Sequence, residues 1–283
     1  MQTRYQLYIN YLKQGICFLL LTAISLYTVF PFLWMVVSSL KTKSEVLDGS
    51  QFFPAVPQIT NYLEILFDSP ILTYILNSLW TSLLIVFLQV LTGAMLAYAL
   101  VFLSFRGQKF IFVVVMGTYM LPVAATYIPS YIILSKGGML NTFTGLIISS
   151  TISIFGIFLL RQAFMQVPKA LVEAARMDGA KHFRILWEIV CPVTKSSFIT
   201  FALMSFISAY NSYMWPSLIT NDPSKYLVSQ GLRRFFIEGG AYGTEWAKVM
   251  AASSVLVIPI LIIFASTQKW FINGIGGETG VKG

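Results

Sequence analysis

Residues 167–195 read VPKALVEAARMDGAKHFRILWEIVCPVTK and form the longest polar run between two charge-free stretches of the chain. Pro168 suits the first turn of a helix, where its missing N–H costs nothing, and apolar residues then recur at helical spacing. Gly179 offers a left-handed stop because it has no Cβ to clash. A second amphipathic helix is predicted from about residue 181 to residue 190, closed by Pro192. The run therefore predicts two short helices joined by a tight glycine turn.

Long apolar windows flank this run on both sides and indicate a membrane protein. The 283 residues are 57% hydrophobic and 11% charged, whereas soluble domains carry about 25% charged residues. Each of six windows supplies the roughly 20 residues that a spanning helix needs. We therefore expect an all-α membrane protein with one transmembrane domain over residues 1–283. The spans are placed at about residues 14–40, 75–104, 110–135, 143–165, 197–219 and 247–268.

The distribution of Lys and Arg predicts how the chain is oriented. If the N-terminus is cytoplasmic, the cytoplasmic segments hold 12 of these residues and the outer segments hold 7. An excess of positive charge marks the cytoplasmic side, and six spans return the chain to the side on which it began. Both termini and the polar run are thus expected in the cytoplasm. Cys17 is then embedded in the membrane and Cys191 is cytoplasmic, so no disulfide is expected.

Several residues inside the windows bear on a solute pathway. Pro122 and Pro129 permit kinks that suit a helix lining a water-filled path, although neighbouring helices could equally absorb such kinks. An unpaired amide is costly in lipid, so Asn211 is expected to face protein or water. Asn77 and Gln89 in the second span raise the same question. The candidate pathway residues are Pro122, Thr126, Tyr210 and Asn211.

Two outer segments have contrasting patterns. Residues 60–67, TNYLEILF, are amphipathic and could lie along the membrane surface or form an ordinary connector. Residues 222–246 contain Gly239, Gly240 and Gly243, and this interval is expected to be irregular.

Chemistry-bearing residues are sparse. His182 is the only histidine, which excludes a zinc or acid–base site built on histidines. The windows hold no acidic residue that could relay protons, and a phosphate-binding GxxxxGK[ST] motif is absent. An integral membrane enzyme is therefore disfavoured. These observations do not exclude an autonomous carrier or channel. That hypothesis, however, leaves Glu173 and Asp178 unexplained in a basic loop.

One spacing in the polar run is specific. Glu173-Ala174-Ala175, three residues, Gly179, nine residues, Ile189, one residue, Cys191 and Pro192 resembles the EAA loop of permease subunits of bacterial ABC importers. That family usually has Leu where Cys191 stands, and cysteine is also a small hydrophobe. The stretches FLLRQAFMQVPKALVEAARMDGA, YNSYMWPSLITNDPSKY and the terminal VKG resemble the carbohydrate branch, which includes the second permease subunit of maltose-type importers.

This resemblance implies a type I ABC importer transmembrane fold, with a cytoplasmic coupling hairpin between spans 4 and 5. It implies a bacterial inner-membrane subunit that forms half of a carbohydrate pathway, or alternatively carries glycerol-3-phosphate or a related polyol phosphate. Implied partners are a second permease subunit, two ATPase subunits, an extracytoplasmic solute-binding protein and membrane lipid, but no nucleic acid. The chain itself would be non-catalytic and bind no metal or cofactor, because ATP and Mg²⁺ belong to the ATPases.

The resemblance also assigns residues to two contacts with the ATPases. The coupling residues are Glu173, Ala174, Ala175, Asp178, Gly179, Ile189 and Pro192. The tail residues expected to reach the ATPases are Gly280, Val281, Lys282 and Gly283.

Overall fold

The computed structural model describes the backbone of residues 2–238 and 245–275, and the side chains of residues 10–234 and 245–270. The described part of the chain is helical and contains no strand, which confirms the expected all-α fold. The chain forms two compact units, which are described separately below. One comprises Met1–Pro70 with Arg234–Val257, and the other comprises Ile71–Arg233 with Ile258–Gly283.

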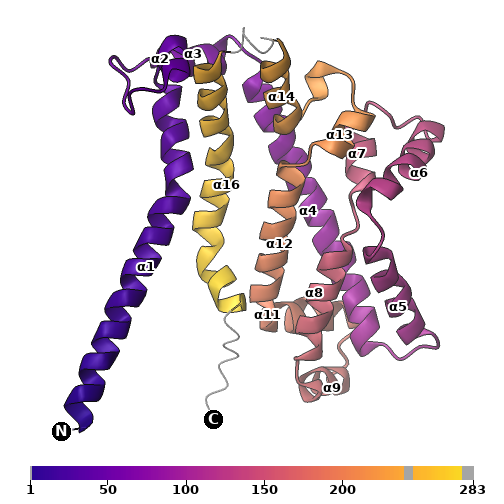
Figure 1. The fold of residues 1–283 in the computed structure, drawn as a ribbon. Helices are drawn as coiled ribbons and strands as arrows, with labels where there is room; N and C mark the ends of the chain where they lie inside the picture. Colours follow the sequence, from indigo (N-terminus) through magenta and orange to yellow (C-terminus); the bar gives the residue numbers. More distant parts are fainter. Residues whose placement is uncertain (1, 239–244, 276–283) are drawn as a thin grey trace. The chain divides into compact units, whose positions relative to one another are not determined.

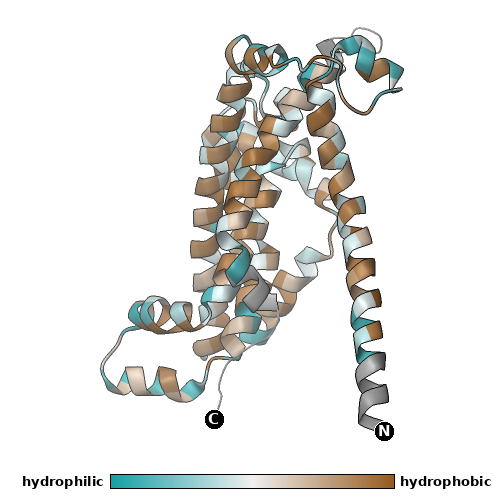
Figure 2. Ribbon diagram, turned by 90° about the vertical axis from the view of Figure 1, so that its left-hand side faces the viewer, coloured by the Kyte–Doolittle hydropathy of each residue, from teal (hydrophilic) through white to brown (hydrophobic). Residues whose placement is uncertain are grey.

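Three of the helices are long and apolar enough to cross a membrane: α1 (Gln2–Ser39), α4 (Ile71–Phe102) and α16 (Trp246–Ile275). Hydrophobic residues predominate along α1, the helix that starts near the N label in Figure 2. Three further pairs of helices, each bent by more than 40° at a short break, are together long and apolar enough to cross a membrane. If each pair is counted as one span, the described residues contain six spans. Two of the pairs correspond to the third and fourth predicted windows, whereas the last pair joins residues 182–193 of the predicted hairpin to residues 195–210.

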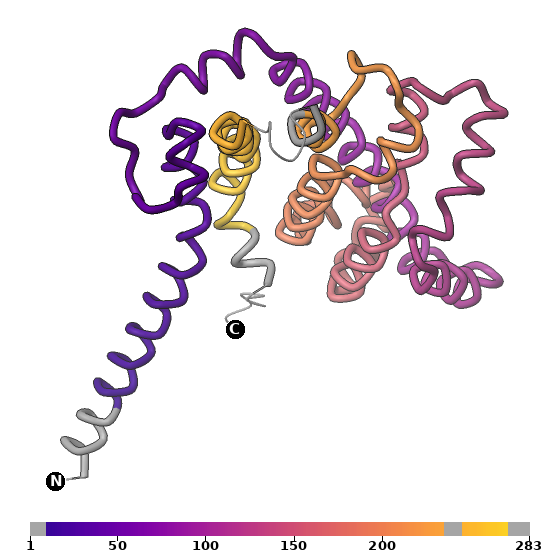
Figure 3. The backbone as a smooth tube through the Cα atoms, turned by 45° about the horizontal axis from the view of Figure 1, so that its top comes forward, coloured from indigo at the N-terminus to yellow at the C-terminus, as the bar shows by residue number. Residues whose placement is uncertain are grey.

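The third window shows the largest departure from a single helix. The sequence predicts one kinked span, whereas α5 (Gln108–Tyr119) and α6 (Val123–Lys136) are separate helices at 102° to each other. Figure 3 shows this change of direction in the chain. Pro122 has no N–H and keeps its preceding residue out of helical geometry, so it breaks the helix and caps the next one.

The core of the larger unit lies where α4, α8 (Ile154–Met165) and α12 (Lys195–Tyr210) pack together (Figure 1). Small residues on α4, including Ala94 and Ala97, are fully buried there. Gly156 on α8 meets α12 so closely that an added Cβ would lie 1.9 Å from the ring of Phe201. Close packing through small residues is typical of membrane helices, because it brings backbones into van der Waals contact.

The smaller unit carries two short helices after α1. The first, α2 (Lys43–Asp48), begins with a capping box in which Thr42 and Glu45 satisfy each other's backbone N–H groups. The second, α3 (Thr60–Phe67), occupies the segment predicted to be amphipathic. Two ion pairs hold this unit together: Lys43–Glu245 at 3.1 Å and Lys248–Glu64 at 2.5 Å.

The expectation that residues 222–246 are irregular is wrong for half of that interval. After the 3₁₀ turn η2 (Pro223–Lys225), residues Val228–Glu238 form α14. Its first turn is fixed by contacts across the larger unit, because the Val228 N–H donates to Ser78 Oγ at 2.9 Å. Gly239, Gly240 and Gly243, which motivated the expectation, lie outside the described residues.

Candidate functional site

The hairpin (residues 167–195) begins with α9 (Lys169–Met177), which ends in a Schellman turn. Gly179 has φ +81°, and its N–H donates to the Arg176 carbonyl at 3.0 Å. The Ala180 N–H donates to the Ala175 carbonyl at 2.9 Å. These two bonds satisfy carbonyls that the helix end would leave unpaired. The predicted left-handed glycine stop is confirmed.

The second half of the hairpin differs from the prediction. It runs through α10 (His182–Arg184), a π-helical turn η1 (Ile185–Val190) and α11 (Cys191–Val193). Pro192 therefore does not close the helix, and the chain turns instead at Thr194, by 87° into α12. A π turn spreads the preceding carbonyls, which relieves the clash that a proline makes with the carbonyl four residues earlier.

Helix α9 has an inner and an outer face. Val172 and Ala175 are buried and join the core cluster of the larger unit. Leu171 and Met177 are 45% and 84% exposed, and Ala174 between them is also exposed. The two alanines of the EAA triplet thus differ in exposure. Ala175 packs against its own chain, and only Ala174 is available to a partner.

Side chains tie the hairpin to the end of α4. Arg176 Nη2 donates to the Phe102 carbonyl at 2.9 Å, which is one of the carbonyls left open at the α4 C-terminus. His182 Nδ1 lies 3.1 Å from the Tyr98 hydroxyl. Both halves of the hairpin are therefore joined to the end of α4. Figure 1 shows α9 at the end of this unit opposite α13 (Met214–Ile219).

The remaining predicted coupling residues divide by exposure. Glu173 and Asp178 are exposed, and neither makes an ion pair within the part of the chain that is described. Pro192 is exposed, whereas Ile189 packs partly against the core. The tail residues Gly280, Val281, Lys282 and Gly283 lie outside the described residues.

Two titratable groups of the hairpin have shifted pKa values. Burial raises the pKa of the Cys191 thiol to about 12. The carboxylate of Glu188, 2.7 Å from Arg184 Nε, raises the pKa of that guanidinium. Cys191 and Cys17 are both free thiols.

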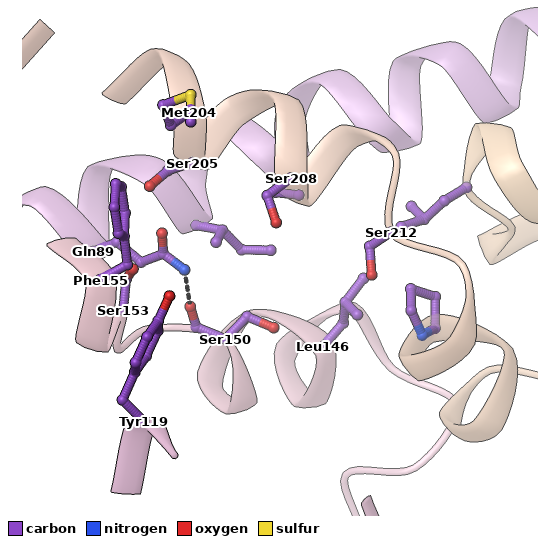
Figure 4. Close-up of a pocket in the computed structure, with 14 residues that line it drawn as sticks. Gln89, Tyr119, Leu146, Ser150, Ser153, Phe155, Met204, Ser205, Ser208 and Ser212 are labelled. Carbon is purple, nitrogen blue, oxygen red and sulfur yellow. Dashed lines mark hydrogen bonds between the residues drawn. The ribbon is translucent and has the colours of Figure 1, made fainter. Parts of the chain in front are cut away.

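A second site lies within the larger unit, between α4, α12 and the start of α8 (Figure 4). It is a cavity of about 480 Å³, which we call the serine cavity. Apolar side chains such as Ile85, Leu146 and Phe155 form part of its wall. Its polar lining residues are Gln89, Tyr119, Ser150, Ser153, Ser205, Ser208 and Ser212.

A helix break forms one wall of the serine cavity. Helix α7 (Phe143–Ser149) and α8 meet at 44°, and the carbonyls at the break are satisfied by α4. Gln89 Nε2 donates to the Ser150 carbonyl at 2.7 Å, and Thr92 Oγ1 donates to the Thr151 carbonyl at 2.9 Å. Figure 4 shows Gln89 reaching this carbonyl, with Ser205 and Ser208 on the facing helix.

None of the four predicted pathway residues borders the serine cavity. Tyr210 is buried and stacks on Phe206, with ring centroids 5.5 Å apart. Asn211 is exposed, and its Nδ2 donates to the carbonyl of Ile207 in its own helix at 3.0 Å. Pro122 and Thr126 are both exposed. In the second span, Gln89 faces the serine cavity, and Asn77 donates to two backbone carbonyls of this unit.

One pattern in the sequence indicates the cavity. Ser205, Ser208 and Ser212 recur at i, i+3 and i+7 along the predicted fifth span. That spacing places three hydroxyl groups on one face of a helix. Polar side chains gathered on one face of a membrane helix face protein or water rather than lipid.

Comparisons with known proteins agree with this architecture. The family described as "Binding-protein-dependent transport system inner membrane component" matches residues 89–276. The chain is 30% identical over 254 residues to the "sn-glycerol-3-phosphate transport system permease protein UgpE" of Brucella abortus, covering 87% of this chain and 90% of that protein. It is 28% identical over 264 residues to the "Arabinooligosaccharides transport system permease protein AraQ" of Halalkalibacterium halodurans, covering 92% and 93%.

A solved structure shares the fold. It belongs to "a bacterial ABC transporter involved in the import of the acidic polysaccharide alginate" and superposes with a TM-score of 0.82. The sequence identity is 24%, and the match covers 91% of this chain and 96% of that one. The chain therefore belongs to the family of binding-protein-dependent transport inner membrane components, the transmembrane permease subunits of ABC importers.

Proposed function

We propose that the chain forms half of the solute pathway of an importer for a carbohydrate and is driven through α9 by a separate ATPase. A homologous permease subunit supplies the other half of the pathway, and two ATPase subunits bind ATP and Mg²⁺. An extracytoplasmic binding protein delivers the solute. The relatives are named as transport permeases, which supports a non-catalytic role for this chain.

The observation that carries the coupling role is the outer face of α9. Its exposed apolar side chains, Leu171 and Met177, flank Ala174, which is small enough to allow close approach of a partner. Glu173 and Asp178 place carboxylates beside that apolar strip, where they can pair with cations of the ATPase. Movement of the ATPase reaches the spans because Arg176 fastens α9 to the end of α4.

The solute class rests on the relatives. One relative is named as a permease of arabino-oligosaccharide transport, which supports a carbohydrate. The alternative, glycerol-3-phosphate or a related polyol phosphate, is supported by the 30% identical relative named for sn-glycerol-3-phosphate.

A charge reversal tests the coupling role. The importer is reconstituted in proteoliposomes, and its ATPase rate is measured with and without loaded binding protein. Glu173→Lys should abolish the stimulation, because it places positive charge against a cationic cleft. Glu188→Lys is the matched control, since Glu188 is exposed on the same hairpin but is absent from α9. Wild-type stimulation in the Glu173→Lys variant, or equal loss in both variants, contradicts the role of α9.

The orientation with both termini in the cytoplasm has its own test. Cys191 is a poor reporter, because a thiol with a pKa of about 12 forms little reactive thiolate at neutral pH. Arg106→Cys in a Cys191→Ser background instead puts a thiol on the exposed segment between α4 and α5, away from the face of α9 that the ATPase covers. A membrane-impermeant maleimide should label it only after the inner membrane is opened. Labelling in intact spheroplasts contradicts the orientation.

The tail, residues 280–283, is proposed to lie between the two ATPases, where its glycines let the backbone pass close to both surfaces. Deleting residues 278–283 should lower the recovery of ATPase with the permease in a pull-down. Full recovery of the ATPase together with a wild-type ATPase rate would contradict the proposed contact of the tail with the ATPases.

A further inference from the structure

We propose that the serine cavity binds one uncharged sugar unit of the solute and rejects solutes that carry phosphate or carboxylate groups. This inference rests on the proposed function, because it places part of the transported carbohydrate in this chain. It also selects between the two solute classes that the relatives leave open.

The hydroxyl groups of the serine cavity are available to a ligand. Serine and threonine side chains in membrane helices usually donate to a carbonyl in their own helix. Thr28, Ser253 and Ser254 do so in this chain. Among the residues that the structure describes, the hydroxyls of Ser205 and Ser208 make no such bond and face the cavity.

The opposite wall adds complementary groups. The Ser150 hydroxyl is likewise without a hydrogen bond in the described part of the chain. Gln89 uses its amide N–H on the helix break, which fixes the side chain and leaves its carbonyl oxygen as an acceptor. A hydroxyl both donates and accepts. Groups of this kind on two facing walls match a ligand with hydroxyls around its rim.

The uncharged lining of the serine cavity favours a neutral ligand over an anion. None of the residues that line the serine cavity is charged. A phosphate or carboxylate removed from water needs a cation or several directed donors, because an unpaired buried charge costs several kcal/mol. A neutral sugar has no such requirement.

Shape and apolar surface agree with this class of ligand. The cavity of about 480 Å³ falls within the range of about 300–1,000 Å³ that is usual for small-molecule sites. Leu146 and Phe155 supply apolar wall between the hydroxyls. A sugar ring presents C–H faces and hydroxyl edges, so both kinds of wall find a counterpart.

The test measures binding to the assembled importer in nanodiscs. The complex is dialysed to equilibrium against a mixture of neutral arabino- and gluco-oligosaccharides with sn-glycerol-3-phosphate, and bound solutes are identified by mass spectrometry. The wild type should retain a neutral sugar. The double variant Ser205→Ala/Ser208→Ala should bind it at least about fivefold more weakly, through the loss of two hydrogen bonds. Alanine favours helix, so α12 should keep its fold.

The matched control removes two hydroxyls that are already bonded to their own helix, in Ser253→Ala/Ser254→Ala. It should retain wild-type binding. Retention of sn-glycerol-3-phosphate overturns the proposal, as does retention of no solute or equal sugar binding by the serine variant and the wild type.

ATPase stimulation by the binding protein, measured on the same preparations, separates the two proposals. If stimulation is intact and binding is unchanged in the serine variant, only the cavity assignment fails. If stimulation is absent in the wild type, the importer role itself fails.

Discussion

Two of the helix breaks in the described part of the chain are stabilised in different ways. The turn after α9 is self-contained, because Gly179 adopts a positive φ and the backbone hydrogen bonds of the turn join residues within 174–180. The break between α7 and α8 depends on another helix, because its carbonyls accept bonds from Gln89 and Thr92 on α4. The first turn lies in the hairpin, outside the spans, and the second lies within a span.

The difference follows from the solvent. Outside the membrane, water can pair with any carbonyl that a turn leaves open, so a local motif is sufficient. In hydrocarbon an open carbonyl costs several kcal/mol, and irregular backbone is tolerated only where protein or a cavity satisfies it. The serine cavity is therefore a tertiary feature that exists only when α4, α8 and α12 are packed.

The largest expected effect comes from that packing. Gly156→Val would place a Cβ 1.9 Å from the ring of Phe201, which is fully buried and cannot move aside. Overpacking should destabilise the larger unit by about 3 kcal/mol. Gly117→Val is the control, since Gly117 is also helical but has nothing within 4 Å. The unfolding temperature of the complex is measured for both variants and should fall only for Gly156→Val. Equal unfolding temperatures would show that the helices can separate at Gly156.

Removing the donors from α4 tests the break directly. Gln89→Leu/Thr92→Val should leave the Ser150 and Thr151 carbonyls unpaired, at a cost of about 2 kcal/mol. Hydrogen–deuterium exchange of residues 150–157 should rise, while exchange in the hairpin stays unchanged. Thr28→Val serves as control, because that hydroxyl bonds only within α1. Unchanged exchange near residue 150 would mean that the break supports itself.

The smallest effect is expected at the hairpin turn. A Cβ at Gly179 would meet nothing within 4 Å. The only cost of a substitution there is the strain of holding a side-chain-bearing residue at positive φ. Gly179→Val should cost about 1–2 kcal/mol, and Gly179→Asn should cost less, because Asn tolerates positive φ. Exchange of residues 175–182 should rise in the valine variant alone. If both variants behave alike, backbone strain does not set the stability of the turn.

These contrasts explain what the sequence could predict. Gly179 was predicted because its hydrogen bonds join residues close in sequence. The order of the spans could be read from charge, since each window is a property of one segment. The break at Pro122 was predicted only as a kink, because a proline marks where a helix is weakened and not the angle that its neighbours impose.

The serine cavity could not be placed from one segment. Its walls combine Gln89, Ser150 and Ser208, which are brought together only by the packing of three helices. The stripe of Ser205, Ser208 and Ser212 was visible, but periodicity alone does not say which helix it faces. Burial of Ala175 was likewise hidden, because both alanines of the triplet have the same propensity and differ only in their tertiary neighbours.

The π turn at Ile185–Val190 makes the length of the hairpin significant. A π turn holds one residue more than the α-helical turn that it replaces. Deleting one residue there would convert the π turn into an α-helical turn and leave the helix beyond it in phase, but the ring of Pro192 would then meet the carbonyl four residues before it. A one-residue deletion between Gly179 and Pro192 should therefore be rejected during divergence.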